Sequence, residues 1–124
     1  GVLLQAAEGD ATVPTIATNI MARDLSAFLL APALAPVFDL PQKVAPFYSA
    51  LQPVGNRSTL YLTSFTEDQA SLPAGSALPT PNNVHNCFPQ VDATITQANT
   101  FFKYGVIEQT CSSAPCVYGT KADC

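Results

Sequence analysis

Two residues, Asp10 and His85, have the types and positions that proton transfer requires. Asp10 ends the turn Glu8-Gly9-Asp10 directly after the apolar run Val2–Ala6, and His85, the sole histidine, comes after the run Ser58–Phe65. In open α/β sheets, residues that follow the carboxyl ends of the strands meet at one edge. A carboxylate bonded to an imidazole fixes its tautomer and stabilises the imidazolium formed during proton transfer. We therefore expect Asp10 and His85 to lie within hydrogen-bond distance.

Each of these residues also has a plainer explanation. Asp10 could cap the helix that Pro14 opens, because acidic residues favour helix starts. His85 could be an ordinary loop histidine beside Cys87. Glu8 is expected to be solvated, although it could replace Asp10 as the acid. The sequence leaves these alternatives open.

The strands and helices that would position the pair are predicted from the spacing of apolar residues and from the Pro and Gly residues at their ends. Val2–Ala6 is nearly continuously apolar, which fits a strand covered on both faces, and Ser58–Phe65 alternates as a strand does. A first helix is expected from Pro14 to about Phe28 and a second from Pro89 to about Tyr104, with Gly105 capping its end. The apolar stripe of the first helix should comprise Ala17, Met21, Leu25 and Phe28, widened by Ile16 and Ile20.

The remaining segments divide the chain further. Residues 29–54 form a Pro-rich insert, expected as short turns and helical stubs whose apolar residues belong to the core or to a lid. Residues 66–88 are expected to be the histidine-bearing loop. We assign residues 1–105 to one α/β domain of strand-helix-strand-helix order, and residues 106–124 to a cysteine-tied tail. Two strands are too few for a stable open sheet, so their neighbours should come from elsewhere.

The stretch "VLLQAAEGDATVPTIATNIMARDL" resembles the acid-bearing region of α/β-hydrolase lipases and esterases of the bacterial extracellular type. The resemblance lies in a strand ending in a Gly-Asp-x-x-Val-Pro turn, followed by a helix with a Thr-Asn-x-x-Ala-Arg pattern. It implies that "STLYLTSF" is the last core strand and "NNVHNCFPQVDATITQANTFFKYG" the histidine loop and final helix. It also implies Asp10 as the catalytic acid and His85 as the general base.

The nucleophile of such an enzyme is missing from this sequence. No Gly-x-Ser-x-Gly occurs, and "PAGSALP" lacks the strand and helix that flank a nucleophile elbow. The chain is therefore expected to be the C-terminal portion of an exported serine carboxylester hydrolase, with the serine on a missing or separate polypeptide that completes the sheet. Its substrate would be an apolar ester, it would be inactive alone, and it would need no cofactor or metal.

The amino-acid composition bears on whether the chain is folded and on what it binds. Only 11% of the 124 residues are charged and 48% are hydrophobic, which favours a packed chain over a disordered one. The net charge of −4 with five basic residues argues against nucleic-acid binding. The same low charge fits a second hypothesis, a non-enzymatic exported subunit that assembles with identical copies at the cell surface.

The four cysteines bear on the compartment. Cys87, Cys111, Cys116 and Cys124 all lie near the C-terminal end, and their spacings match no zinc ribbon or finger. Two disulfides in a secreted, periplasmic or surface protein are the better interpretation, with zinc ligation as the alternative. Four cysteines allow three pairings, of which Cys111–Cys116 with Cys87–Cys124 is preferred.

Overall fold

The computed structural model describes residues 2–34, 36–45, 47–48, 58–65, 83–111 and 116–118. Its elements, in chain order, are β1 (Val2–Glu8), α1 (Thr15–Asp24), β2 (Phe28–Ala31), β3 (Gln42–Val44), β4 (Phe47–Tyr48), β5 (Ser58–Phe65), α3 (Val84–Cys87), the 3-10 turn η1 (Phe88–Gln90), α4 (Asp92–Tyr104), β6 (Val106–Ile107) and β7 (Cys116–Tyr118).

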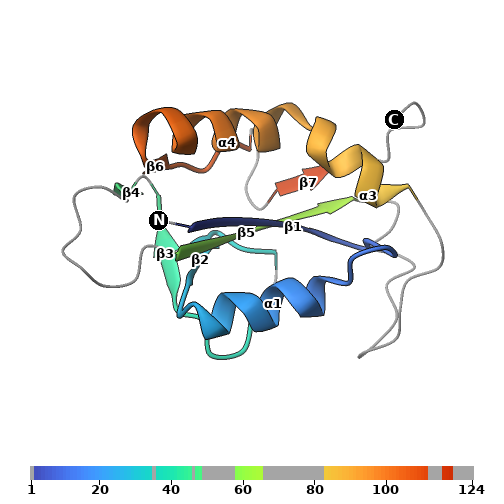
Figure 1. Ribbon diagram of the computed structural model, residues 1–124, viewed down its shortest axis with the longest axis horizontal. Coiled ribbons are helices and arrows are strands. Elements are labelled where there is room, and N and C mark those ends of the chain that lie inside the picture. The colour runs from blue at the N-terminus through green and yellow to red at the C-terminus, as the bar shows by residue number, and fades with distance from the viewer. Residues whose placement is uncertain are drawn as a thin grey trace.

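The centre of the structure is a five-stranded sheet of order β1-β5-β2-β3, with β7 paired to β5. All of its strand pairs are parallel. Helix α1 covers one face of the sheet and α4 the other, so the chain forms three layers (Figure 1). Strands β4 and β6 make a separate antiparallel pair. The predicted α/β class with a parallel sheet is therefore confirmed.

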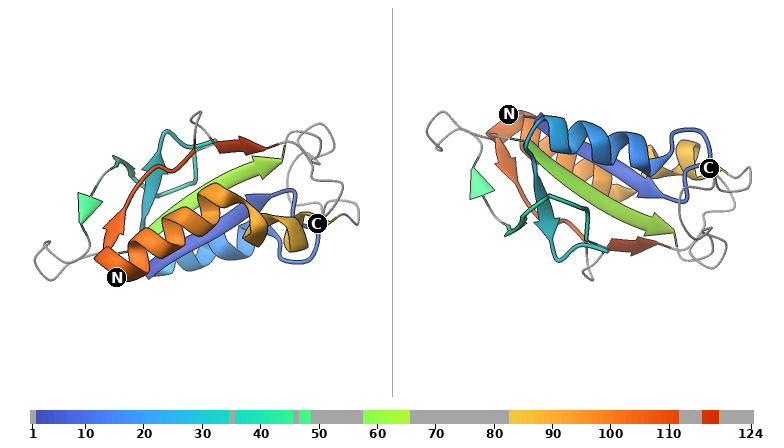
Figure 2. Two further views of the ribbon diagram at one scale, coloured as in Figure 1. Left: turned by 90° about the horizontal axis from the view of Figure 1, so that it is seen from above. Right: turned by 90° about the horizontal axis from the view of Figure 1, so that it is seen from below.

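The prediction of turns and helical stubs for residues 29–54 is wrong in the part that the structure describes, because β2, β3 and β4 all fall within residues 28–48. Burial of Leu29 and Leu30 in the core stabilises β2 more than the nearby prolines disfavour regular structure. We expected the strands that neighbour the two predicted strands to come from another polypeptide. This is wrong for β5, whose neighbours β1, β2 and β7 all belong to this chain. Strand β5 pairs with β1 along one edge, whereas β2 and β7 pair with successive parts of its other edge (Figure 2).

Strand β1 lies at the end of the sheet. It pairs with β5 over its whole length, and no other described strand pairs with it. Ala6 and Ala7 are buried, but Leu3, Leu4 and Gln5 are only half-buried. The strand predicted as covered on both faces is thus only partly covered among the described residues.

Helix α1 presents the opposite face to the one that its apolar pattern predicts. Ala22 is fully buried, and Thr15, Thr18 and Asn19 are half-buried on the same side. The residues of the predicted core stripe on this helix, with Leu25 just after it, are instead exposed: Ile16, Ala17, Ile20, Met21 and Leu25. The helix also ends at Asp24, and Phe28 belongs to β2.

Helix α4 begins three residues later than predicted. Pro89 lies in η1, and Val91 rather than Pro89 precedes the first turn of the helix. The predicted end is confirmed: Gly105 adopts φ 66° and its amide donates to the Phe101 carbonyl at 2.9 Å. This left-handed conformation is one that glycine adopts without steric penalty.

Candidate functional site

Asp10 is held at the carboxyl end of β1 by the turn that follows the strand. Gly9 has φ 85°, a left-handed conformation that reverses the chain directly after Glu8. One carboxylate oxygen of Asp10 accepts hydrogen bonds from the amides of Thr12 at 2.7 Å and Val13 at 2.8 Å. Helix α1 has no side-chain cap, so Asp10 orders the turn and does not cap the helix.

The start of α1 is tied to the same strand end. The Thr15 hydroxyl donates to the carbonyl of Ala7 at 2.9 Å. Pro14 directly precedes the helix, and its carbonyl accepts from the amide of Ala17 at 2.9 Å. The turn from Gly9 to Pro14 is therefore anchored at both ends, which leaves the Asp10 carboxylate little freedom to move.

His85 lies on the short helix α3, although the sequence predicted a loop there. Val84 and Cys87, on either side of it, are buried in one cluster with Ala7 of β1 and with Val91. This packing fixes α3 beside the strand end that carries Asp10. The signal for it was the apolar pair at positions 84 and 87, whose three-residue spacing places both on one helix face.

The two side chains meet as predicted. His85 Nδ1 lies 2.9 Å from Asp10 Oδ2. The carboxylate side chain is 8% exposed, whereas the imidazole is 46% exposed. When the carboxylate accepts this hydrogen bond, Nδ1 carries the proton and Nε2 offers its lone pair outward. A carboxylate-bonded, half-exposed imidazole is the arrangement that a catalytic acid–base pair requires.

The remaining partner of such a base is not among the described residues. No described hydroxyl or thiol is hydrogen-bonded to His85, whose one polar partner in that part of the chain is Asp10. The serine of "PAGSALP" lies outside the described residues, as does most of the loop 66–88. Across the described ranges, no three His, Cys, Asp or Glu side chains are grouped to hold a metal ion.

Glu8 lies two residues before Asp10, but it is not the solvated residue that the sequence predicted. It is half-buried at the end of β1, and burial raises its pKa above the ordinary value of 4.5. Desolvation penalises the charged carboxylate, which is why the pKa rises. The imidazole contacts Asp10 and not Glu8, so Asp10 is the acid of the pair.

Of the four cysteines, the side chains of Cys87 and Cys111 are described. Both are disulfide-bonded rather than free thiols. The side chain of Cys116 and all of Cys124 lie outside the described part of the chain, so the preferred pairing stays a prediction.

Helix α4 is fastened over the sheet by a buried polar chain that the sequence did not reveal. Gln5 of β1 donates to the carbonyl of Thr94 at 3.0 Å and to the Gln97 side-chain oxygen at 2.9 Å. Gln97, fully buried, in turn donates to the carbonyl of Glu108 at 2.8 Å. These bonds fix α4, and with it η1 and α3, relative to β1.

The comparisons with known proteins return no relative. None of the described helices is both long enough and apolar enough to cross a membrane. Neither a family model, nor a curated protein, nor a solved structure matches this chain.

Proposed function

We propose that this chain is the acid- and histidine-bearing part of an exported serine carboxylester hydrolase of the α/β-hydrolase type. The serine would be on a separate polypeptide, and the chain alone would be inactive. The observation that carries the proposal is the Asp10–His85 hydrogen bond of 2.9 Å at the carboxyl edge of a parallel sheet. Active sites of open α/β sheets form at this edge.

In the proposed reaction, Nε2 of His85 takes the proton of the serine hydroxyl as its oxygen attacks the ester carbonyl. The imidazolium, stabilised by the Asp10 carboxylate, then gives that proton to the departing alkoxide, which leaves as the alcohol. Water cleaves the acyl-enzyme by the same steps and releases the acid. Each step needs the oriented base that Asp10 and His85 form.

Two further observations support the compartment and the substrate class. Cys87 and Cys111 are both disulfide-bonded, which favours a secreted, periplasmic or cell-surface protein. The described residues that bond to Asp10 or pack against the helix of His85 carry no charge: Thr12, Val13, Ala7, Val84, Cys87 and Val91. This surrounding suits an apolar ester better than an anionic substrate.

The test is activity-based labelling of the protein isolated from its natural source. A fluorophosphonate should label a serine on a second polypeptide that co-purifies with this chain, and the complex should hydrolyse p-nitrophenyl esters. Rebuilding the complex with His85→Gln should abolish both labelling and hydrolysis. A co-purifying polypeptide that neither reacts nor confers esterase activity would refute the proposal.

The alternative of a non-enzymatic assembly subunit rests on a different observation, the outward apolar face of α1. Ile16, Ile20 and Met21 are 60%, 45% and 53% exposed there. Contiguous exposed apolar residues mark interaction surfaces. Filaments or rings of identical copies, with no serine-bearing polypeptide, would favour this alternative.

A further inference from the structure

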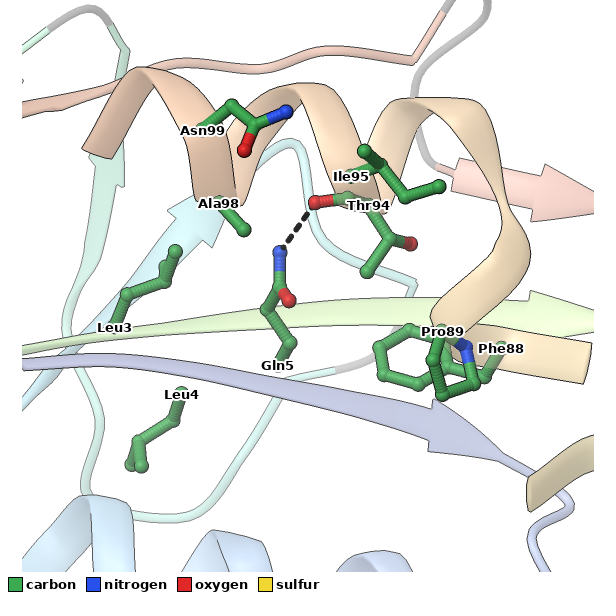
Figure 3. Close-up of a pocket in the computed structure, with 9 residues that line it drawn as sticks. All are labelled: Leu3, Leu4, Gln5, Phe88, Pro89, Thr94, Ile95, Ala98 and Asn99. Carbon is green, nitrogen blue, oxygen red and sulfur yellow. Dashed lines mark hydrogen bonds between the residues drawn. The ribbon is translucent and has the colours of Figure 1, made fainter. Parts of the chain in front are cut away.

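A groove with a volume of about 570 Å³ lies between β1 and α4. Its described lining residues come from the strand, from the helix and from the 3-10 turn η1 before the helix (Figure 3). The apolar ones are Leu3, Leu4, Phe88, Pro89, Ile95 and Ala98. The others, Gln5, Thr94 and Asn99, are polar but uncharged. Small-molecule sites share this size, about 300–1,000 Å³, and this mixture of an apolar wall with a few polar groups.

Gln5 presents a hydrogen-bond acceptor to the groove. Its Nε2 donates to the carbonyl of Thr94 at 3.0 Å and to Gln97 Oε1 at 2.9 Å, so both hydrogens of the amide nitrogen are used. Because a carbonyl oxygen can only accept, the nitrogen of this amide and not its oxygen must face Thr94. The oxygen Oε1 is left over, and no described residue donates a hydrogen bond to it. Gln5 is therefore an acceptor whose orientation is fixed by its own donor bonds.

Thr94 adds a hydroxyl that lacks a partner. The residue is 4% exposed, and its Oγ1 makes no hydrogen bond among the described residues. Figure 3 shows the side chain on the side of α4 that faces the sheet, next to the Gln5 side chain that its own carbonyl binds. Buried hydroxyls are nearly always hydrogen-bonded. An unpartnered one that lines a groove points to a ligand that supplies the missing bond.

We propose that the groove binds an uncharged alcohol with an apolar chain. The ligand hydroxyl donates to Gln5 Oε1 and accepts from Thr94 Oγ1, because a single hydroxyl is both donor and acceptor. The chain of the ligand lies against the apolar wall of the groove. A carboxylate fits less well, since it has no hydrogen to donate to Gln5 and its charge would be buried without a partner of opposite sign.

This site is separate from the pair formed by Asp10 and His85. Neither residue is among the described residues that line the groove. The proposal therefore goes beyond the proposed function and is tested on the chain without a serine-bearing polypeptide. An alcohol is also one product of ester hydrolysis, so the ligand class is compatible with the proposed function without depending on it.

An NMR titration of the isotope-labelled chain with 1-octanol tests the position of the site. The shifts should saturate and should be confined to the groove, above all to the amide of Thr94 and the methyl groups of Leu3 and Ile95. Shifts centred instead on Ile16 and Ile20, on the exposed apolar face of α1, would overturn the proposal. Shifts that never saturate would do the same, because they would indicate unspecific binding to apolar surface.

Thr94→Val removes the hydroxyl and keeps the shape of the side chain. It should weaken 1-octanol binding about three- to tenfold, as the loss of one hydrogen bond does. It should not lower the melting temperature, since the hydroxyl has no described partner in the free chain. Thr96→Val makes the same change at an exposed position of α4 outside the described lining, and should alter binding less than about twofold. Equal binding by the two variants contradicts the role given to the Thr94 hydroxyl.

Two further probes test the chemical class of the ligand. Heptyl methyl ether is an isomer of 1-octanol that can accept from Thr94 but cannot donate to Gln5. Octanoate has the same chain length and carries a charge at neutral pH. Both should bind at least about threefold more weakly than 1-octanol. If either binds as tightly as 1-octanol, the groove does not select an alcohol and the proposal fails.

Discussion

His85 Nδ1 lies 2.9 Å from one carboxylate oxygen of Asp10, whose other oxygen accepts the backbone amides of Thr12 and Val13. Backbone amides therefore orient one oxygen of the carboxylate, and the imidazole bonds to the other oxygen. A residue that only ordered the turn would not need its second oxygen directed at a histidine. This arrangement makes the structural role of Asp10 and its proposed catalytic role separable by mutation.

Asp10→Asn should lower the kcat of ester hydrolysis by the rebuilt complex about 10³- to 10⁴-fold. The amide nitrogen would face Nδ1 of His85 as a donor, so the histidine would adopt the tautomer whose Nε2 carries a proton and cannot act as a base. Steady-state hydrolysis of p-nitrophenyl esters measures the loss. Asp24→Asn, an exposed position on α1, is the control and should leave kcat unchanged.

Asp10→Ala should reduce the free energy of unfolding by about 1–3 kcal/mol, because the amides of Thr12 and Val13 lose the buried acceptor that they share. Asp10→Asn should cost less, since the amide oxygen can still accept from Thr12 and Val13. Urea denaturation followed by circular dichroism measures both. If Ala and Asn destabilise equally, the turn does not depend on the acceptor.

The site was predictable from the sequence because it depends on residue type and chain order. A lone histidine and a Gly-Asp turn after separate strands suffice to predict a meeting at the carboxyl edge of a parallel sheet. The tertiary anchors were not predictable in the same way. Gln5 and Gln97 are polar, so their residue types predict surface positions. Only the fold shows that the Gln5 amide donates to the side-chain oxygen of Gln97, between β1 and α4.

The short strands β3, β4, β6 and β7 were not predicted either. Each has only two or three residues, too few to show a period of two. They form because neighbouring strands present backbone partners, as Phe47–Tyr48 does for Val106–Ile107. Such non-local pairing leaves no local trace in the sequence.

Gln97→Leu should destabilise the chain by about 2–3 kcal/mol. The substitution leaves the Gln5 amide and the carbonyl of Glu108 without one of their partners inside the structure. Gln90→Leu is the control: its hydrogen bond to the Asn86 carbonyl is exposed, so water can replace it at little cost. Thermal unfolding of both variants should show a loss at Gln97 and almost none at Gln90.

Glu8→Gln should stabilise the chain at neutral pH, because burial raises the pKa of the Glu8 carboxyl. The folded state then holds the proton to higher pH than the unfolded state, whose pKa is near 4.5. Stability from neutral Glu8 is therefore complete below about pH 4.5 and is lost as pH rises through the raised value. Urea unfolding from pH 4 to 8 should show the variant's advantage growing across that window. An advantage independent of pH would contradict the desolvation explanation.

The two faces of α1 give the sharpest contrast between pattern and structure. The apolar spacing predicts that Ile20 is in the core, yet it is 45% exposed, whereas Ala22 on the opposite side is fully buried. Ile20→Gln should therefore change the free energy of unfolding by less than about 0.5 kcal/mol, as surface substitutions do. Ala22→Leu should cost about 1–3 kcal/mol, because the added methylenes have no space against Ala6 and Leu29. Urea titration of the chain alone would rank the two substitutions by their loss of stability.

The reverse order would mean that the helix packs through its apolar stripe after all. In the complex, a larger loss for Ile20→Gln than in the chain alone would show that a partner covers this face.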